Sequence, residues 1–456
     1  MTDAAIAPGH PVPTGLAPVP RARTALPPLV AIYLVCIVVP VTMNVGPIYL
    51  TGLRVLLLAL VIPLTLRLLT GGAGRVGWPD VLLLLHGIWI FVALAVNNPD
   101  RVVQQAPSVI VEFLGGYLVA RIAIRTPAAF EATMRFVVAL VLCLMPFAVL
   151  EAVTGEPLLV RAVAALPAVG SIDVVTIEGR LGLERVQATF QHPIHFGLFC
   201  SVAFSMAFVG LEGVYGGARR WLTSIAVAGC GFLALSSGAL LAIALQIGLI
   251  VWSALLPRMD GRWWLLAGLG ALAYVAVDLL SNRTPVQVFL SYATFSSHTA
   301  YWRSIILDWG LRNVAANPLF GIGLNDWERP YYMYSGSMDN FWLVMAVRYG
   351  VPGFATVALA WLLVMVGLLR RPFARDSRLG RQRRAMVFTL LGLSFTLITV
   401  HVWTNIYSFT FFLMGAGIWM LTWDEAENGG GDPDARPATP HPTTAFTRQR
   451  RRHVRA

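Results

Sequence analysis

Charged side chains are scarce in this chain of 456 residues. Only 12% of the residues are charged, whereas 57% are hydrophobic, and the mean hydropathy is +0.69. Soluble domains carry about 25% charged residues, so this composition excludes a soluble protein and predicts an integral membrane protein. An open sheet cannot satisfy its backbone hydrogen bonds in lipid, and each spanning segment is therefore expected to be a helix.

Lysine is absent, so all 34 basic side chains belong to arginine. Short loops alternate between arginine-rich and arginine-poor, and the positive-inside rule makes the arginine-rich ones cytoplasmic. The net charge of +11 thus reflects orientation and a basic tail, and we expect no nucleic-acid partner. The arginine-rich short loops hold Arg67 and Arg75, Arg121 and Arg125, Arg219 and Arg220, Arg258 and Arg262, and the arginines from Arg370 to Arg384.

Cysteine is rare as well, and it follows no ligand or disulfide spacing. The four cysteines fall within predicted membrane spans, where they are expected to be small core residues. They are Cys36, Cys143, Cys200 and Cys230. No zinc site is predicted from them, because structural zinc needs closely spaced cysteine or histidine ligands.

Long apolar runs dominate what is present. A span needs roughly 20 residues, and twelve segments reach or approach that length. They lie at 26–43, 49–70, 77–96, 106–124, 129–150, 193–211, 221–235, 237–256, 263–281, 341–369, 385–402 and 404–423. The predicted fold is an all-α polytopic membrane domain over 26–423, with about twelve spans and both termini inside. The pair 221–256 is short for two full spans, so a tilted or partly re-entrant pair is an alternative. Residues 1–25 and 424–456 are predicted to be disordered cytoplasmic tails.

Two long polar stretches, 153–190 and 282–340, interrupt the apolar runs, and this topology puts both outside. The first ends in Arg180, Arg185, His192 and His195 beside a predicted helix that Pro193 could open. Guanidinium groups together with the free amides of that first turn predict an anion site. The alternative for Arg185 is contact with lipid headgroups. Two histidines without a third ligand give little support to a metal site.

The second stretch predicts a surface helix. Thr299 is a plausible N-cap, apolar residues form one stripe from 301 to 309, and the helix is expected to stop before Pro318. Arg303 and Arg312 are nine residues apart, about 180° around such a helix. They cannot both face one cleft, and Arg312 is the one expected to be solvated.

Aromatic residues and a broken helix follow. Trp327 and Tyr331 are candidates for stacking on sugars, with an interfacial aromatic belt as the alternative. The run 341–369 is too long for one upright span, and Gly350, Pro352 and Gly353 are expected to break it. This leaves a short helix over 340–349 that carries Arg348, whose charge requires protein or water around it.

These motifs together resemble the O-antigen ligase and polymerase superfamily of bacterial inner-membrane proteins. The matching strings are Arg185-x-x-x-Thr-Phe-x-His-Pro, Ser236-Ser-Gly-Ala, Asn317-Pro-Leu-Phe-Gly-Ile-Gly, Asp339-Asn340-x-Trp342 and Arg348-Tyr-Gly-Val-Pro-Gly. The resemblance covers roughly 180–370. It implies a metal-independent glycosyltransferase without cofactor, of the membrane type with a periplasmic active site. Its donor would be a glycan on undecaprenyl diphosphate.

The resemblance also implies roles for residues. A lipid diphosphate leaving group needs fixed cations, and arginine binds phosphate oxygens bidentately. Arg185 and Arg303 are expected to form this clamp, with Arg180 and Arg348 as helpers. An acceptor hydroxyl needs a base, for which Asp339, His298, His195 and His192 are candidates, and a mechanism without a base is the alternative. Trp327, Tyr331 and Trp342 are candidates for sugar binding. The outer loops lack an Asp-x-Asp motif, in agreement with metal independence.

One departure from the family pattern favours a polymerase over a ligase. Ligases typically carry His-Asn where this chain has Asp339-Asn340. We therefore expect polymerisation of exopolysaccharide or O-antigen repeats, with ligation to lipid A-core as the alternative. A transporter of lipid-linked glycan would show internal repeats and polar residues at mid-membrane; no repeat is visible here. A scaffold among polysaccharide assembly or export proteins, which are candidate partners, stays open.

Overall fold

A computed structural model describes residues 25–46, 48–285, 287–288 and 297–424. The predicted tails 1–25 and 424–456 lie almost wholly outside these residues. The helices are α1 (Pro28–Val38), α2 (Gly52–Leu69), α3 (Trp78–Asn97), α4 (Val102–Ala123), α5 (Pro127–Thr154), α6 (Leu158–Ala164), α7 (Pro193–Ser205) with the π-helical turn η1 (Met206–Gly210), α8 (Gly217–Leu233), α9 (Ser237–Leu255), α10 (Arg262–Leu280), α12 (Ser297–Ala316), α13 (Phe341–Arg370), α14 (Arg378–Thr399) and α15 (Thr404–Thr422).

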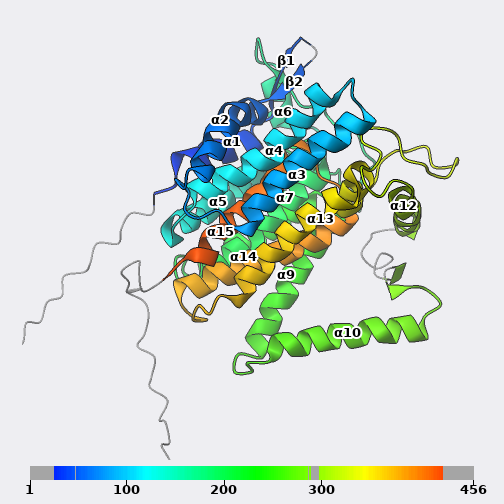
Figure 1. Cartoon of the computed structure of the whole chain (residues 1–456). Helices are drawn as coiled ribbons and strands as arrows, with labels where there is room; N and C mark the ends of the chain where they lie inside the picture. Colours follow the sequence, from blue (N-terminus) through cyan, green and yellow to red (C-terminus); the bar gives the residue numbers. More distant parts are fainter. Residues whose placement is uncertain (1–24, 47, 286, 289–296, 425–456) are drawn as a thin grey trace, which may run out of the picture.

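Most of the described helices pack as a bundle, from which α10 extends with no buried residue (Figure 1), and this helical architecture confirms the all-α polytopic class. Within the described ranges, nine helices are long and apolar enough to cross a membrane. Three of the twelve predicted spans correspond to α1, α8 and α14, which are not among these nine helices because they are shorter or more charged. Twelve crossings therefore stay a prediction.

Helices α4 and α15 form the centre of the bundle, and most of their residues are buried. A Cβ on Gly116 would lie 2.4 Å from the Ser408 carbonyl oxygen, so glycine permits the close approach of the two helices. Tyr33 of α1 stacks on Phe412 at 4.7 Å and shares a hydrogen bond with Ser408. The core is thus aromatic packing around closely spaced backbones.

The first predicted span, 26–43, is wrong over its last five residues. Helix α1 ends at Val38, and residues after Pro40 form a small sheet of β1 (Val41–Val45), β2 (Ile48–Thr51) and β3 (Gly170–Ser171), in the order β2-β1-β3. Proline has no N–H to continue the helix, and the β-branched residues that follow favour extended backbone. The sheet ties the first polar stretch to the N-terminal helices through Thr42, whose hydroxyl donates to the Ser171 carbonyl.

Two buried carboxylates inside the bundle are paired with arginines. Glu112 accepts a hydrogen bond from the Arg54 guanidinium at 2.7 Å, and Arg121 pairs with Asp80 at 3.1 Å. Tyr117 also donates to Asp80. Such pairing is what a charge needs at membrane depth, and it gives these groups a structural explanation.

Both long polar stretches lie at the same end of the bundle, which we call the loop face. Val186 N–H donates to the Leu233 carbonyl at the end of α8, and Arg180 donates to Leu235. At the same end, Phe341 N–H donates to the Val400 carbonyl between α14 and α15. The opposite end, the arginine-rich face, holds the starts of α8 and α14.

The predicted break in the long helix α13 is confirmed at Gly350. Its φ is 71°, and a Cβ there would lie 2.1 Å from the Leu319 carbonyl oxygen. No other residue type fits this left-handed position against a neighbouring backbone. Val351 N–H then donates to the Pro318 carbonyl at 2.7 Å. The break therefore seats the second polar stretch on the end of the bundle.

Candidate active site

A cleft of about 360 Å³ opens between α12 and the segment 332–339. Trp302, Ile306, Tyr332, Met333 and Tyr334 supply its apolar and aromatic walls, and Arg303, Ser335, Ser337 and Asp339 supply its polar groups. The Ser337 hydroxyl donates to the Asp339 carboxylate at 2.9 Å. A cation, a carboxylate and aromatic rings thus meet in one concave space, a combination typical of ligand sites.

Arg303 faces this cleft with little exposure to solvent. Its side chain belongs to a residue that is 9% exposed, and its Nε and Nη1 atoms have no hydrogen-bond partner among the described residues. Burial lowers the pKa of Arg303; Asp339 opposes this shift and Arg180 adds to it. A buried guanidinium with free donors is suited to an oxyanion.

Arg312 lies on the other side of α12, as the nine-residue spacing predicts. It is 63% exposed and pairs with Asp308 one turn earlier, at 2.7 Å. The helix itself ends at Ala316, before Pro318, also as predicted. The sequence therefore identified correctly which of the two arginines turns inward.

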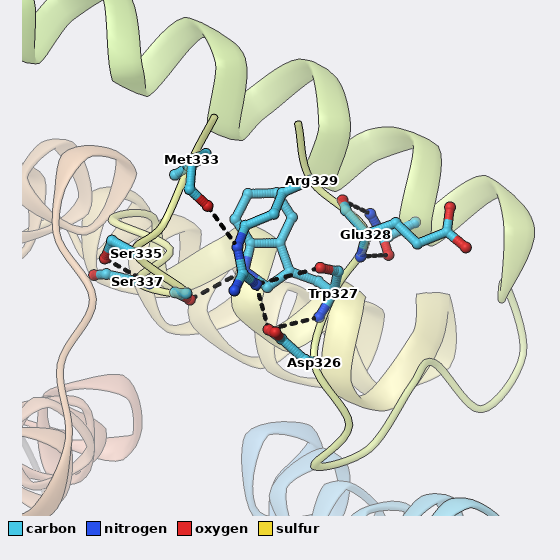
Figure 2. A network of polar contacts seen from close by, with 9 residues as sticks. Asp326, Trp327, Glu328, Arg329, Met333, Ser335 and Ser337 are labelled. Atoms are coloured by element: carbon cyan, nitrogen blue, oxygen red, sulfur yellow. Dashed lines mark hydrogen bonds and ion pairs between the residues drawn. The ribbon is translucent and has the colours of Figure 1, made fainter. Parts of the chain in front are cut away.

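The wall of the cleft is held by a polar network around Arg329 (Figure 2). Its guanidinium lies over the Trp327 ring, donates to the Met333 carbonyl at 3.0 Å and pairs with Asp326. The Trp327 indole donates to the Gly336 carbonyl at 3.0 Å. This closes the loop into a compact unit whose far edge lines the cleft.

Two asparagines attach the same loop to helices. The Asn313 side chain of α12 donates to the Glu328 carbonyl at 2.8 Å and accepts from Glu328 N–H at 2.9 Å. At the end of α3, Asn98 accepts from Leu324 N–H and donates to Asn325. Arg303 and the opposite cleft wall are therefore fixed relative to one another.

The Arg185 segment is held by a buried carboxylate from α5. Glu151 accepts from the backbone N–H of Gln187 at 2.7 Å and of Ala188 at 3.1 Å. Ala188 has a φ of 52°, a conformation that costs energy for a residue with a side chain. The Gln187 side chain adds bonds to Val175, Asp173 and Phe190. Glu151 thus stabilises the backbone from which Arg185 projects.

Arg185, Arg180 and Arg303 form one cationic cluster, although they come from two polar stretches. Burial, followed by the nearby Arg180, lowers the pKa of Arg185 to about 10. Arg180 likewise acts on Arg303, so it lies near both of them. The Arg185 Nε is buried without a hydrogen-bond partner among the described residues. Like charges are gathered here at a cost, which an anionic ligand would offset.

Histidines and a tryptophan border the cluster at the start of α7. His192 is the N-cap, and its Nδ1 accepts from Ile194 N–H at 3.1 Å, with Pro193 in the first turn as predicted. His195 is 1% exposed, and its ring centroid lies 4.1 Å from that of Trp403. His401 follows in the α14–α15 connection, where burial and then Arg348 lower its pKa to about 3. Burial lowers the pKa of His192 as well, so the neutral imidazole is favoured at His192 and His401.

The other predicted site residues lie in different surroundings. Trp327 is buried inside its loop, Tyr331 is 94% exposed, and Trp342 packs edge-on against Phe354 and Trp361. Arg348 is exposed, and its carbonyl accepts from Gly323 N–H. The side chain of His298 lies outside the described residues. Their roles in binding or catalysis stay predictions.

Sequence reasoning missed several contributors. Glu151 lies next to the end of a predicted apolar span, and nothing in the sequence around it indicated that its carboxylate binds another polar segment. Trp403 lies in the short connection between α14 and α15, where the sequence shows no motif. Ser335 and Ser337 could have been predicted as site residues, because they are polar residues close to Asp339 in the sequence. Tertiary contacts, rather than local pattern, bring all of these to the site.

The bundle and its cleft together define a class of protein. It is a polytopic helical membrane protein with an arginine-lined, aromatic-walled cleft at one end of the bundle. Within the described ranges no group of three histidine, cysteine or acidic side chains could hold a metal ion.

A family model described as O-antigen ligase matches residues 222–358, from α8 into α13. This match confirms the resemblance to the O-antigen ligase and polymerase superfamily, whose members are glycosyltransferase-like enzymes acting on lipid-linked oligosaccharides. No match is found among curated proteins. The matched region contains Arg303, the cleft and the break at Gly350, whereas Arg185 and Glu151 lie before it.

Proposed function

We propose that this protein polymerises exopolysaccharide or O-antigen repeats at the periplasmic face of the bacterial inner membrane. The donor would be a glycan carried on undecaprenyl diphosphate, and the acceptor a hydroxyl of a second carrier-bound repeat. The observation that carries the proposal is the cluster of Arg180, Arg185 and Arg303, with buried donors on Arg185 and Arg303 that have no partner among the described residues.

The proposed reaction is a single displacement. The acceptor oxygen forms a bond to the anomeric carbon while the bond from that carbon to the diphosphate oxygen breaks. Negative charge then grows on the diphosphate, where preorganised guanidinium groups stabilise it. The acceptor proton passes to Asp339, which lines the cleft with Arg303. His195 and His298 stay the alternative bases, although His195 is enclosed beside Trp403.

Ligation to lipid A-core is the second candidate, on the strength of the family match. The Asp339-Asn340 pair favours the polymerase, because ligases typically carry His-Asn at this position. Asn340 has a structural task, since its side chain accepts from Leu343 N–H and caps α13. Transport of lipid-linked glycan gains no support from the paired charges Arg54–Glu112 and Arg121–Asp80.

The test is an assay with protein in liposomes and lipid-linked repeats, with and without EDTA. Chain lengthening that survives EDTA is the expected result. Transfer to added lipid A-core would establish the ligase instead, and movement of the lipid without new bonds would establish transport. Activity lost in EDTA and restored by one divalent cation would overturn the metal-free mechanism.

A further inference from the structure

A second concave surface lies on the bundle side, away from the candidate active site. It is an apolar groove of about 460 Å³ between α7 with η1, α8 and α9. Aromatic and branched side chains form its walls, among them Phe204, Phe208, Trp221, Ile225, Phe232 and Ile250. A groove with these walls suits a hydrocarbon chain.

Arg220 stands at one end of this groove. Its guanidinium carbon lies 4.8 Å from the centroid of the Phe208 ring, and Phe208 contacts Trp221 edge-on at 4.7 Å. This end belongs to the arginine-rich face, because α8 starts here and finishes at Leu233 on the loop face. The 17 residues of α8 separate the two faces by about 25 Å, at 1.5 Å per residue.

Positive charge exceeds negative charge around that end. Arg220 pairs with Glu212 at 2.6 Å, and Glu212 also acts on Arg384. Even so, the buried Nε atoms of Arg220 and Arg384 have no hydrogen-bond partner among the described residues. The surrounding charged groups are the cations Arg219, Arg375 and Arg383 and the anion Asp376. Donors thus remain for an anion beside the groove.

We propose that this groove binds an anionic phospholipid. One acyl chain would occupy the space between α8 and α9, and Arg220 and Arg384 would hold the phosphate. Any lipid covers an exposed apolar face, but the half-buried guanidinium group of Arg220 at the groove's end, with the half-buried Arg384 close to its partner Glu212, favours a negatively charged headgroup. The glycan carrier does not fit, because its diphosphate would then lie on the face opposite Arg303. The inference is independent of the proposed reaction.

Two glycines provide a matched pair of variants. Gly229 of α8 lines the groove, whereas Gly248 of α9 does not, and an added Cβ at either meets no atom within 4 Å. Leucine is thus tolerated at both positions, but Gly229→Leu fills the groove. Arg220→Gln removes the headgroup contact and is the second variant, with the added loss of its pair with Glu212.

The experiment titrates detergent-purified protein with phosphatidylglycerol, phosphatidylcholine or inorganic phosphate, with native mass spectrometry and the thermal midpoint as readouts. We expect phosphatidylglycerol to bind at least about fivefold more tightly than phosphatidylcholine, since one charged contact is worth about 1 kcal/mol. Gly229→Leu and Arg220→Gln should lose this preference and Gly248→Leu should keep it. Equal binding of the two lipids, an unaffected Gly229→Leu variant, or full stabilisation by inorganic phosphate alone would overturn the proposal.

Discussion

Arg303 and Arg312 show how much a single position decides. Both are arginines of α12, yet one is buried in the cleft wall and the other is exposed and paired with Asp308. They therefore allow the clamp to be tested within one helix, where composition and helical propensity are matched.

Replacing Arg303 by lysine should reduce turnover by about 100-fold or more, the usual effect of losing a preorganised oxyanion donor. Lysine keeps the charge but lacks the planar fork that binds phosphate bidentately. Arg312→Lys is the control and should retain full activity. The measurement is polymer formation at equal protein levels. Wild-type turnover in Arg303→Lys would remove this residue from the clamp.

Glu151 is expected to act through Arg185 as a positioning residue. In Glu151→Gln, an NH2 group replaces one of the two carboxylate oxygens. One of the two backbone N–H groups that donate to Glu151 then loses its acceptor. A buried unsatisfied donor costs about 1–3 kcal/mol, so we expect a lower thermal midpoint and roughly tenfold lower turnover. The deciding comparison is a double-mutant cycle with Arg185→Lys. Non-additive losses support positioning, whereas full additivity would mean that Glu151 only stabilises the fold.

At the scale of elements, the N-cap of α7 depends on the protonation state of His192. The neutral His192 ring accepts from Ile194 N–H, and burial followed by Arg185 lowers the pKa of His192 from its usual 6.5 to about 4. Between these values the unfolded chain binds a proton that the folded protein excludes. Stability contributed by His192 is therefore present above pH 6.5 and is lost as the pH falls toward 4.

His192→Asn keeps a capping side chain without this titration. The variant should lose less thermal stability than the wild type between pH 7 and pH 5, measured by thermal unfolding in detergent. Some acid sensitivity will persist, because His401 also has a lowered pKa. An identical pH dependence in the two proteins would show that His192 does not contribute.

Element boundaries were predictable where local chemistry is decisive. Pro318 ended α12 as expected, and the Gly350 break in α13 followed from glycine and proline in an over-long apolar run. The residues after Val38 were not predictable as strand. Their apolar character suits a span, and their extended form comes with pairing to Ile48–Thr51 and to Gly170–Ser171, the latter far along the chain.

At the scale of the whole molecule, the proposed site requires the two polar stretches to share one side of the membrane. Single cysteines at Leu181 and Tyr331, which are 72% and 94% exposed, should react with an impermeant maleimide from the same side in a background lacking the native cysteines. A cysteine at Arg258, in the connection between α9 and α10, should react only after permeabilisation. Labelling of positions 181 and 331 from opposite sides would contradict the shared site.

The sequence by itself determined the membrane class and the inward face of α12, because hydropathy and helical period are local properties. Only the tertiary structure decided that Arg180 lies near both Arg185 and Arg303, that Glu151 holds the backbone beside Arg185, and that Trp327 is enclosed in its own loop. These contacts join residues distant along the chain, and their geometry follows from helix packing that no local pattern encodes.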